Sequence, residues 1–469
     1  MINKSKMPLW TLEHKKKGTQ ITKIKDKYYL YKVKSIWDKD AKKSKKITEE
    51  YLGRITPEGI VTPKHKRELK IECPKEYGNI SFVNSFGEDL IKKLKHYFPY
   101  DYESIICVAI IKLCYQSRIN NMSLRYKTSH LSKIYENANM SPKKISELLN
   151  TLGNDDHIIK KFFEDLKEES ETIAIDLTSI FTDSENISFA EKGHNSKKIY
   201  HDQLQFLMLY SLTQNLPTFF KVLPGSVRDV SSLVNAIEES GYSDAILVSD
   251  RGFTSENNWK FLEGKSLKYI FPLRRNSALL SYNTSKHKDY FMFRERVIWY
   301  REFEKKSRRI IQFLDKKLLA EEEKTYICLK EKKIVTKKEY EKKKGGFGII
   351  SIITNTDKTP KDIFEIYKSR NDIEIAFDIM KNCLNDDKTY MQSTENVKGY
   401  FFITFLSLYL YIKIQNLLKE KKMLKKYSVT NTLLHLSKFY KFNVNDKEII
   451  SEIPKQTRLI MEKLGIPIT

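Results

Sequence analysis

The chain has 469 residues, which is too long for one ordinary hydrophobic core and predicts two or three domains. Its 84 lysines and arginines outnumber its 60 aspartates and glutamates, so a net charge of +24 favours a polyanionic partner. The five cysteines are scattered and form no Cys-x2-Cys pair, which argues against a disulfide framework or a zinc site and predicts a cytoplasmic protein.

The apolar segments give no reason to expect a membrane partner. The first ten residues, MINKSKMPLW, lack the apolar core of a secretory signal. The longest apolar stretch runs from Tyr400 to Ile412, contains Thr404 and Ser407, and stops at Lys413. It is too short to cross a bilayer, so we expect a buried helix.

Residues 1–75 predict a small, strongly basic β-rich module. Aromatic and charged residues alternate in KYYLYKVKSIW, and Thr56-Pro57-Glu58-Gly59 predicts a turn. Residues 1–70 hold 20 lysines and arginines against 8 acidic residues, an excess of 12. Nucleic acid is the first candidate for such a region. The alternative is a coding bias that inflates lysine, although such a bias does not explain why the excess gathers at one end.

Residues 76–169 predict a helical region. The segments GEDLIKKLKHYF, SIICVAIIKLCYQS and SPKKISELLNTLG have helical spacing, and Ser141-Pro142 is typical of a helix start. Short lysine-bearing helices suggest a helix-turn-helix that binds DNA. Ordinary helix packing explains the same pattern equally well.

The rest of the chain predicts an α/β core interrupted once. Residues 170–273 give three strands followed by alternating helices and strands, which is the RNase H-like layout. Residues 274–347 then predict a β-rich insertion, with strands in FMFRERVIWYREF and RRIIQFLDKKL and a polar, flexible return through KEYEKKKGG. The core resumes in residues 348–400 with FGIISIITN and a helix. Residues 401–469 predict a helical C-terminal region.

Three carboxylates stand at informative places in this core. Asp176 and Asp250 each follow an apolar run that predicts a buried strand, in ETIAIDLTSI and DAILVSDRGF. Each aspartate alone is more typical of a turn at a strand end. Together with Glu374, on the helix predicted in IFEIYKSRNDIEIAFDIMKNCL, they form an ordered set of hard oxygen ligands that suits Mg²⁺.

Glu374 shares its predicted helix with other polar side chains. At about 100° per residue, Arg370, Glu374 and Lys381 fall near 300°, 340° and 320° from Tyr367, so all four share a stripe about 60° wide. A hydroxyl, a carboxylate and two cations on one stripe could hold a metal beside a phosphate. The alternative is a solvated face with an Arg-Glu pair at i, i+4.

These residues resemble a known family. Asp176, Asp250 and Glu374, with the spacing Tyr-x2-Arg-x3-Glu-x6-Lys, are similar to the DDE transposases of bacterial and archaeal insertion sequences, in the branch with the Tyr-Arg-Glu-Lys signature. FFKVLPGSVRDVSSL, SDRGFTSENN and NVKGYFFITFLSLYLY agree, and the resemblance covers residues 170 to 465. It implies an RNase H-like catalytic core with an insertion between the second aspartate and the glutamate.

The resemblance also implies the chemistry. Asp176 would bridge two Mg²⁺ ions, for which Mn²⁺ can substitute, while Asp250 and Glu374 would each hold one. Water would cut the DNA strand first, and the freed 3′-hydroxyl would then attack target DNA. Tyr367, Arg370 and Lys381 would bind phosphates near the element end.

The same resemblance implies a further DNA contact at Trp299 and the partners, and the place of Arg251 directly after Asp250 suggests another contact. Trp299, in RVIWYREF, would stack on a flipped terminal base, although a tryptophan in a strand is usually core. Arg251 would contact DNA or pair with an acid. The expected partners are double-stranded element ends with inverted repeats and target DNA, bound by a homodimer in the paired-end complex. A DNA-binding protein that has lost catalysis, and a nuclease of the same fold that only hydrolyses, are the alternatives.

Overall fold

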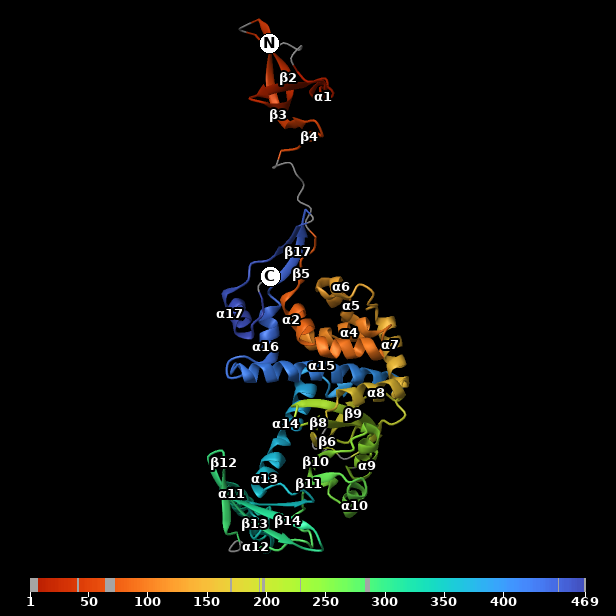
Figure 1. Ribbon diagram of the computed structural model, residues 1–469, viewed down its shortest axis with the longest axis vertical. Helices are drawn as coiled ribbons and strands as arrows, with labels where there is room; N and C mark the ends of the chain where they lie inside the picture. Colours follow the sequence, from red (N-terminus) through yellow and green to blue (C-terminus); the bar gives the residue numbers. More distant parts are fainter. Residues whose placement is uncertain are drawn as a thin grey trace. The chain divides into compact units, whose positions relative to one another are not determined.

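The computed structural model describes residues 7–39, 42–63, 72–168, 171–193, 195, 199–227, 229–282, 287–445 and 447–467, with the backbone alone for 229–233. Two compact units divide the chain. The smaller comprises residues 1–73 and 442–449, and the larger comprises residues 74–441 and 450–469. Helices and strands of both are drawn in Figure 1.

The helices within these residues are α1 (Leu9–Leu12), α2 (Gly78–Phe86), α3 (Glu88–Tyr97), α4 (Tyr102–Tyr115), α5 (Ile119–Thr128), α6 (Leu131–Ile134), α7 (Pro142–Asn154), α8 (Asp156–Leu166), α9 (Asp229–Ser240), α10 (Glu256–Gly264), α11 (Lys316–Glu331), α12 (Lys337–Lys344), α13 (Pro360–Ser369), α14 (Asn371–Asp378), α15 (Thr394–Glu420), α16 (Val429–Leu436) and α17 (Lys455–Leu464).

The strands are β1 (Thr19–Ile24), β2 (Lys27–Asp38), β3 (Lys43–Thr56), β4 (Gly59–Val61), β5 (Lys75–Glu76), β6 (Glu171–Thr182), β7 (Glu191–Lys192), β8 (Asp202–Ser211), β9 (Leu216–Pro224), β10 (Ala245–Ser249), β11 (Lys268–Pro272), β12 (Asp289–Phe293), β13 (Arg296–Glu304), β14 (Arg309–Asp315), β15 (Ile349–Thr354), β16 (Lys388–Thr389), β17 (Tyr440–Val444) and β18 (Lys447–Ile450).

The smaller unit is built on an antiparallel sheet of β1, β2, β3 and β4 in that order. Its core is small and consists of Ile21, Tyr28, Leu30 and Ile55. Trp10 closes one side, with its ring edge-on to the ring of Tyr28 at a centroid distance of 5.5 Å. The apolar residues of this core alternate along β2, as the period of a half-buried strand requires.

The larger unit contains one mixed sheet. Its order is β12-β13-β14-β15-β11-β10-β6-β8-β7, with β9 also on β8 and β16 on β6. Strand β8 runs antiparallel to both β6 and β9, whereas β10 is parallel to both β6 and β11. The order β9-β8-β6-β10-β11 with these directions is the RNase H-like arrangement, so the predicted fold class is confirmed.

Residues 274–347 differ from the expected stretch of strands and flexible chain. Strands β12, β13 and β14 form an antiparallel meander that joins the core sheet through β15, rather than a separate sheet. The segment KEYEKKKGG folds largely as helix α12, because Thr336 and Glu339 form a capping box at its start. The segment RRIIQFLDKKL divides between β14 and helix α11, whose first amides bond the Asp315 carboxylate.

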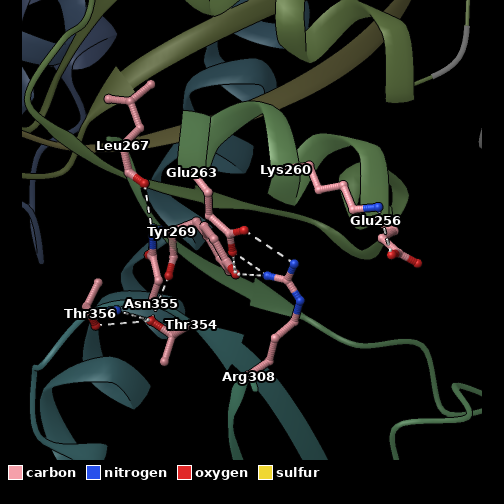
Figure 2. Close-up of polar contacts among 9 residues, drawn as sticks. All are labelled: Glu256, Lys260, Glu263, Leu267, Tyr269, Arg308, Thr354, Asn355 and Thr356. Carbon is pink, nitrogen blue, oxygen red and sulfur yellow. Dashed lines mark hydrogen bonds and ion pairs between the residues drawn. The ribbon is translucent and has the colours of Figure 1, made fainter. Parts of the chain in front are cut away.

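A polar cluster ties the turn between β13 and β14 to the core, as Figure 2 shows. The Arg308 guanidinium donates to both Glu263 oxygens on α10 and, at 2.9 Å, to the Tyr269 hydroxyl on β11. Beside it, Asn355 receives the Tyr269 amide at 2.8 Å and donates to the Leu267 carbonyl at 3.0 Å. The meander is therefore anchored to the same strands that form the core.

Helix α15, with 27 residues, lies between other helices and the sheet of the larger unit (Figure 1). It packs against α4 and α7 on one side and against β9 on another. Its approach to α7 is very close, since a Cβ at Gly399 would lie 2.0 Å from the Leu149 carbonyl oxygen. Among the described residues α15 is the one helix long and apolar enough to cross a membrane, but 78% of its apolar window is buried. This agrees with the expectation of a buried helix.

Candidate active site

The parallel pairing of β6 and β10 brings the two aspartates together. The register runs from Ala245 opposite Glu171 to Ser249 opposite Ile175, so the next residues in line are Asp250 and Asp176. Strand β6 does not end there, as the sequence had suggested, but continues to Thr182 paired with β8. What ends at Ile175 is only the pairing with β10. The next pairing on that side of β6, with β16, begins at Phe181.

The local turn after β10 explains why Asp250 reaches solvent. Buried residues of β10 end at Ser249, and the chain then enters a short 3-10 turn over Arg251–Phe253. The Phe253 side chain is buried and its amide bonds the Asp250 carbonyl at 3.2 Å, which fixes the turn. The Asp250 side chain stays exposed at the end of the strand.

The segment that contains Glu374 forms two short helices, α13 and α14, and not the one long helix expected. Helix α13 begins at Pro360 after the N-cap Thr359, as predicted. The helix is interrupted at Arg370, α14 carries Glu374, and the chain then becomes a π-helix over Ile379–Cys383. Lys381 lies within this π-helix, where each residue advances fewer degrees round the axis than in an α-helix. The stripe predicted for Tyr367, Arg370 and Glu374 therefore does not extend to Lys381.

Arg370 bridges two of the three carboxylates. Its guanidinium lies 3.4 Å from Asp176 Oδ2 and 2.5 Å from Glu374 Oε1. The Arg370 side chain is 13% exposed, whereas Glu374 is 50% exposed. The expected Arg-Glu pair at i, i+4 is therefore present, but it is not a solvated surface pair, because Arg370 also reaches the buried strand β6.

The charges of the cluster act on one another. The pKa of Asp176 is raised to about 7, mainly by burial; Arg370 and the Leu177 amide oppose the rise, and the nearby carboxylates of Asp250 and Glu374 add to it. Burial lowers the pKa of Arg370, but the three carboxylates outweigh burial and raise it. Three acidic groups thus act on one buried guanidinium, that of Arg370.

Tyr367 and Arg251 belong to the same cluster. Burial raises the pKa of the Tyr367 hydroxyl, with Asp250 and Glu374 raising it and Arg370 and Arg251 lowering it. Arg251 also lowers the pKa of Tyr282, which burial raises. The structure therefore gathers six residues from three separate segments of the chain: Asp176, Asp250 with Arg251, and Tyr367 with Arg370 and Glu374.

A comparison with protein families finds a match to the region that contains this cluster. The family described as the transposase DDE domain matches residues 167–410, which is more than half of the chain and contains all three carboxylates. The chain belongs to the DDE transposase family.

Comparisons with individual proteins add one description. Among solved structures, the transposase is similar to the piggyBac transposase in its synaptic complex with hairpin DNA, with 11% identity and a TM-score of 0.40. That likeness covers 79% of this chain and 82% of the other. A comparison with curated proteins finds no match. The family assignment rests on the domain match.

The donor set of the transposase suits a hard divalent cation, since all three ligands predicted for it are carboxylates. Burial and like charge make ionised Asp176 costly, so a cation at this place would stabilise the cluster. Within the described ranges no three Asp, Glu, His or Cys side chains stand close enough together to hold a metal as they are. Arg370 supplies the positive charge between two of them instead.

Trp299 lies elsewhere in the transposase, on β13 of the meander. Its ring faces Tyr290 of β12 at a centroid distance of 5.1 Å, and the Lys316 ammonium lies 5.2 Å from the ring centroid. The side chain is half-buried, and its neighbours Tyr290 and Met292 are 63% and 57% exposed. It is therefore not a core tryptophan, the alternative weighed from the sequence.

Sequence reasoning missed a second charged cluster in the transposase. Lys112 of α4 donates to Asp386 Oδ1 at 2.9 Å and to the Tyr400 hydroxyl at 2.7 Å, and Tyr400 donates to the same Asp386 oxygen at 2.6 Å. Lys112 and Asp386 are 5% and 0% exposed. A lone lysine inside the apolar run SIICVAIIKLCY was the signal that could have found it, because such a lysine needs a buried partner.

Proposed function

We propose that this transposase cleaves DNA at the ends of an insertion sequence and joins the freed ends to target DNA. The observation that carries the proposal is the register of β6 and β10, which aligns Asp176 with Asp250, together with the Arg370 bridge that links Asp176 to Glu374. Two guanidinium groups, those of Arg370 and Arg251, stand against three carboxylates, and the raised pKa of Asp176 is typical of a place where catalysis tunes pKa values.

The reaction is phosphoryl transfer in two steps. In the first, a water oxygen bonds to the phosphorus of a phosphodiester at the element end, the bond to the 3′-oxygen breaks, and that oxygen gains a proton. In the second, the new 3′-hydroxyl gives up its proton and bonds to a target phosphorus, and a target 3′-oxygen leaves. Each step exchanges one phosphorus–oxygen bond for another, so no oxidant or covalent enzyme intermediate is needed.

The carboxylates would hold Mg²⁺. Two such ions, or Mn²⁺ in their place, supply charge neutralisation at the attacking and leaving oxygens. Asp176, Asp250 and Glu374 would be their protein ligands. Binding would require Glu374 to share or leave Arg370, which its half-exposed position allows.

The cations of the cluster have a separate task. Arg370 and Arg251 would bind non-bridging phosphate oxygens, which suit the planar fork of a guanidinium, and Tyr367 would donate its protonated hydroxyl. We include Lys381 as a point charge for the same DNA strand.

We also propose that Trp299 stacks on an unpaired terminal base, supported by its half-exposed ring and the cation beside it.

The test uses single isosteric changes. Asp176→Asn, Asp250→Asn and Glu374→Gln should each abolish cleavage of labelled end duplexes while leaving DNA affinity within about twofold, because these side chains are not part of the broad basic surface. Asp378→Asn is the matched control, since Asp378 is an exposed carboxylate one turn after Glu374 on the same helix. Wild-type cleavage by Asp176→Asn would remove the assignment.

Strand transfer separates the rival functions. Labelled ends incubated with a target plasmid and Mg²⁺ should yield joined products with the wild-type chain. Cleavage without joining would identify a hydrolytic nuclease, and binding without cleavage would identify a DNA-binding protein that has lost catalysis.

The proposed assembly is a homodimer on paired element ends in the cytoplasm. Native electrophoresis of end duplexes with a mixture of tagged and untagged chains should give three paired complexes, the middle one containing one chain of each size. Two complexes without the middle one would show a single chain per complex and remove the homodimer.

A further inference from the structure

The β2–β3 hairpin of the smaller unit extends well beyond its core. Strand β1 pairs with β2 only up to Lys32, and β4 pairs with β3 only over Arg54–Thr56. The four buried core residues all lie in that paired base. Residues 34–39 and 42–47, which we call the arm, therefore form a two-stranded ribbon, and no third strand pairs with it within the described part of this unit.

The arm exposes both lysines and large apolar side chains. It carries six lysines, namely Lys34, Lys39, Lys42, Lys43, Lys45 and Lys46, against the single acidic residue Asp38. Between these charges stand Ile36, Trp37 and Ile47, which are 47%, 63% and 44% exposed. A charge run alone is usually a solvated face, but apolar side chains at the same place gain nothing from water. The combination fits a surface that an anionic, partly apolar partner covers.

The register assigns these residues to two faces. Directly paired residues share a face, so Lys34 with Ile47, Ile36 with Lys45 and Asp38 with Lys43 make one face. The pairs Ser35 with Lys46 and Trp37 with Ser44 make the other. The first face combines lysines with aliphatic side chains. The second, which we call the serine face, presents two hydroxyls, one ammonium and one indole.

Size and shape select the partner. Five paired residues per strand give a ribbon about 17 Å long, and two strands with their side chains match a groove about 12 Å wide. That is the major groove of B-form DNA, which admits a two-stranded ribbon. The minor groove is about half as wide, and the major groove of an RNA duplex is too narrow and deep for a ribbon.

We propose that the arm enters the major groove of duplex DNA with its serine face toward the base edges. Hydroxyls of Ser35 and Ser44 can donate to or accept from any base, and Trp37 offers apolar contact to thymine methyl groups. Lysines of the other face and of the ribbon ends reach the phosphates on both sides. This interaction rests on the proposed function only in that DNA is the substrate, and it names a contact remote in sequence from the catalytic carboxylates.

Salt dependence tests the charge contact. The full chain is titrated with fluorescent end duplex across a range of NaCl concentrations. Lys34→Gln/Lys43→Gln/Lys45→Gln, which changes lysines of the face opposite the serine face, should weaken binding to any duplex and reduce the slope of log affinity against log salt by roughly one per lysine. The control Lys15→Gln/Lys16→Gln/Lys17→Gln removes the same charge from exposed positions at the base of the same unit. Equal losses in both triples would show that total charge, and not the arm, binds DNA.

Chemical probing tests the groove. Dimethyl sulfate methylates guanine N7 in the major groove and adenine N3 in the minor groove. The wild-type chain should protect guanines, and Ser35→Ala/Trp37→Ala/Ser44→Ala should lose that protection and roughly tenfold of its preference for end duplex over a scrambled duplex. Its salt slope should stay unchanged. Protection of adenine N3 alone, or retained guanine protection in this variant, would overturn the assignment.

Cleavage measured in parallel separates the two proposals. If both arm variants bind and probe like the wild type while Glu374→Gln still abolishes cleavage, the arm inference fails and the proposed function stands. If arm-dependent protection is present but the wild-type chain never cuts or joins DNA, the proposed function fails and the arm remains a DNA contact.

Discussion

Two clusters of the larger unit, one around Lys112 and one around Arg370, bring a cation to carboxylates, and their charges are balanced differently. Around Lys112 one ammonium meets one carboxylate and one hydroxyl, and both charged side chains are 5% exposed or less. Around Arg370 one guanidinium meets Asp176 and Glu374 with Asp250 nearby, and Glu374 is half exposed. A matched, closed pair has no charge left for a ligand. The unmatched, open cluster does.

The hydroxyl of Tyr400 illustrates how closed the first cluster is. Burial, together with Asp386, raises the pKa of Tyr400 far above its usual range, so the hydroxyl stays protonated and donates to Asp386. The pair joins α4, the loop after the π-helix and α15, which are distant in sequence. Its role is to hold those elements together, whereas the Arg370 cluster leaves acidic groups facing one another.

Breaking the closed pair should have the largest effect on stability. Asp386→Ala leaves a buried, unpaired ammonium and should lower the free energy of unfolding by about 3–5 kcal/mol. Denaturant unfolding of the full chain measures this. Lys112→Met/Asp386→Ala should recover part of the loss, because no unpaired charge remains. Glu147→Ala, which removes an exposed pair with Lys144, is the control and should cost less than about 1 kcal/mol. A similar cost for Asp386→Ala and Glu147→Ala would erase the distinction between closed and exposed pairs.

Neutralising the open cluster should instead stabilise the protein at high pH. The folded-state pKa of Asp176 lies near 7, above its ordinary value of 3.8, so the folded chain binds more protons between these values and stability falls as pH rises through the window. Asp176→Asn removes this dependence. In EDTA it should be more stable than wild type at pH 8, by at most about 4 kcal/mol, with the gain shrinking toward pH 4.

Unfolding at several pH values checks this prediction, with Asp378→Asn as the control. A loss of stability for Asp176→Asn at pH 8 would mean that the cluster is as well balanced as the buried pair.

The smallest effect is expected at Glu374. Because this side chain is half exposed, Glu374→Gln should change the free energy of unfolding by less than about 1 kcal/mol while abolishing cleavage. Unfolding and cleavage are measured on one preparation of Glu374→Gln, so that the free energy of unfolding and the cleavage rate can be compared directly with those of the wild type. A large loss of stability would assign Glu374 a structural role like that of Asp386.

Sequence reasoning found the aspartates because a buried strand followed by a carboxylate is a local pattern. The sequence predicted a strand end at Asp176 because an apolar run shows only where full burial stops. Strand β6 continues past Asp176 with half-buried residues and stays paired with β8. The break at Arg370 and the π-turn at Lys381 were missed because no proline or glycine marks them, so tertiary packing overrides the local periodicity.

Lys112 and Asp386 were missed for a different reason. They are 274 residues apart, and no local pattern relates them. The arm lies between these cases: its first strand was predicted from the alternation in KYYLYKVKSIW, but only the register shows which lysines and serines share a face.

The meander also bears on the order in which the three carboxylates can come together. Strand β15 precedes the helices that carry Glu374, and it pairs with β14 over six residues but with β11 over only three. Chains emerge from the ribosome from the N-terminus, and pairings between distant strands form late. The two aspartates can therefore assemble on a nascent chain well before the meander templates β15. The third carboxylate arrives last, so an unfinished chain that stops before Glu374 lacks one of the three ligands proposed to hold the metal ions.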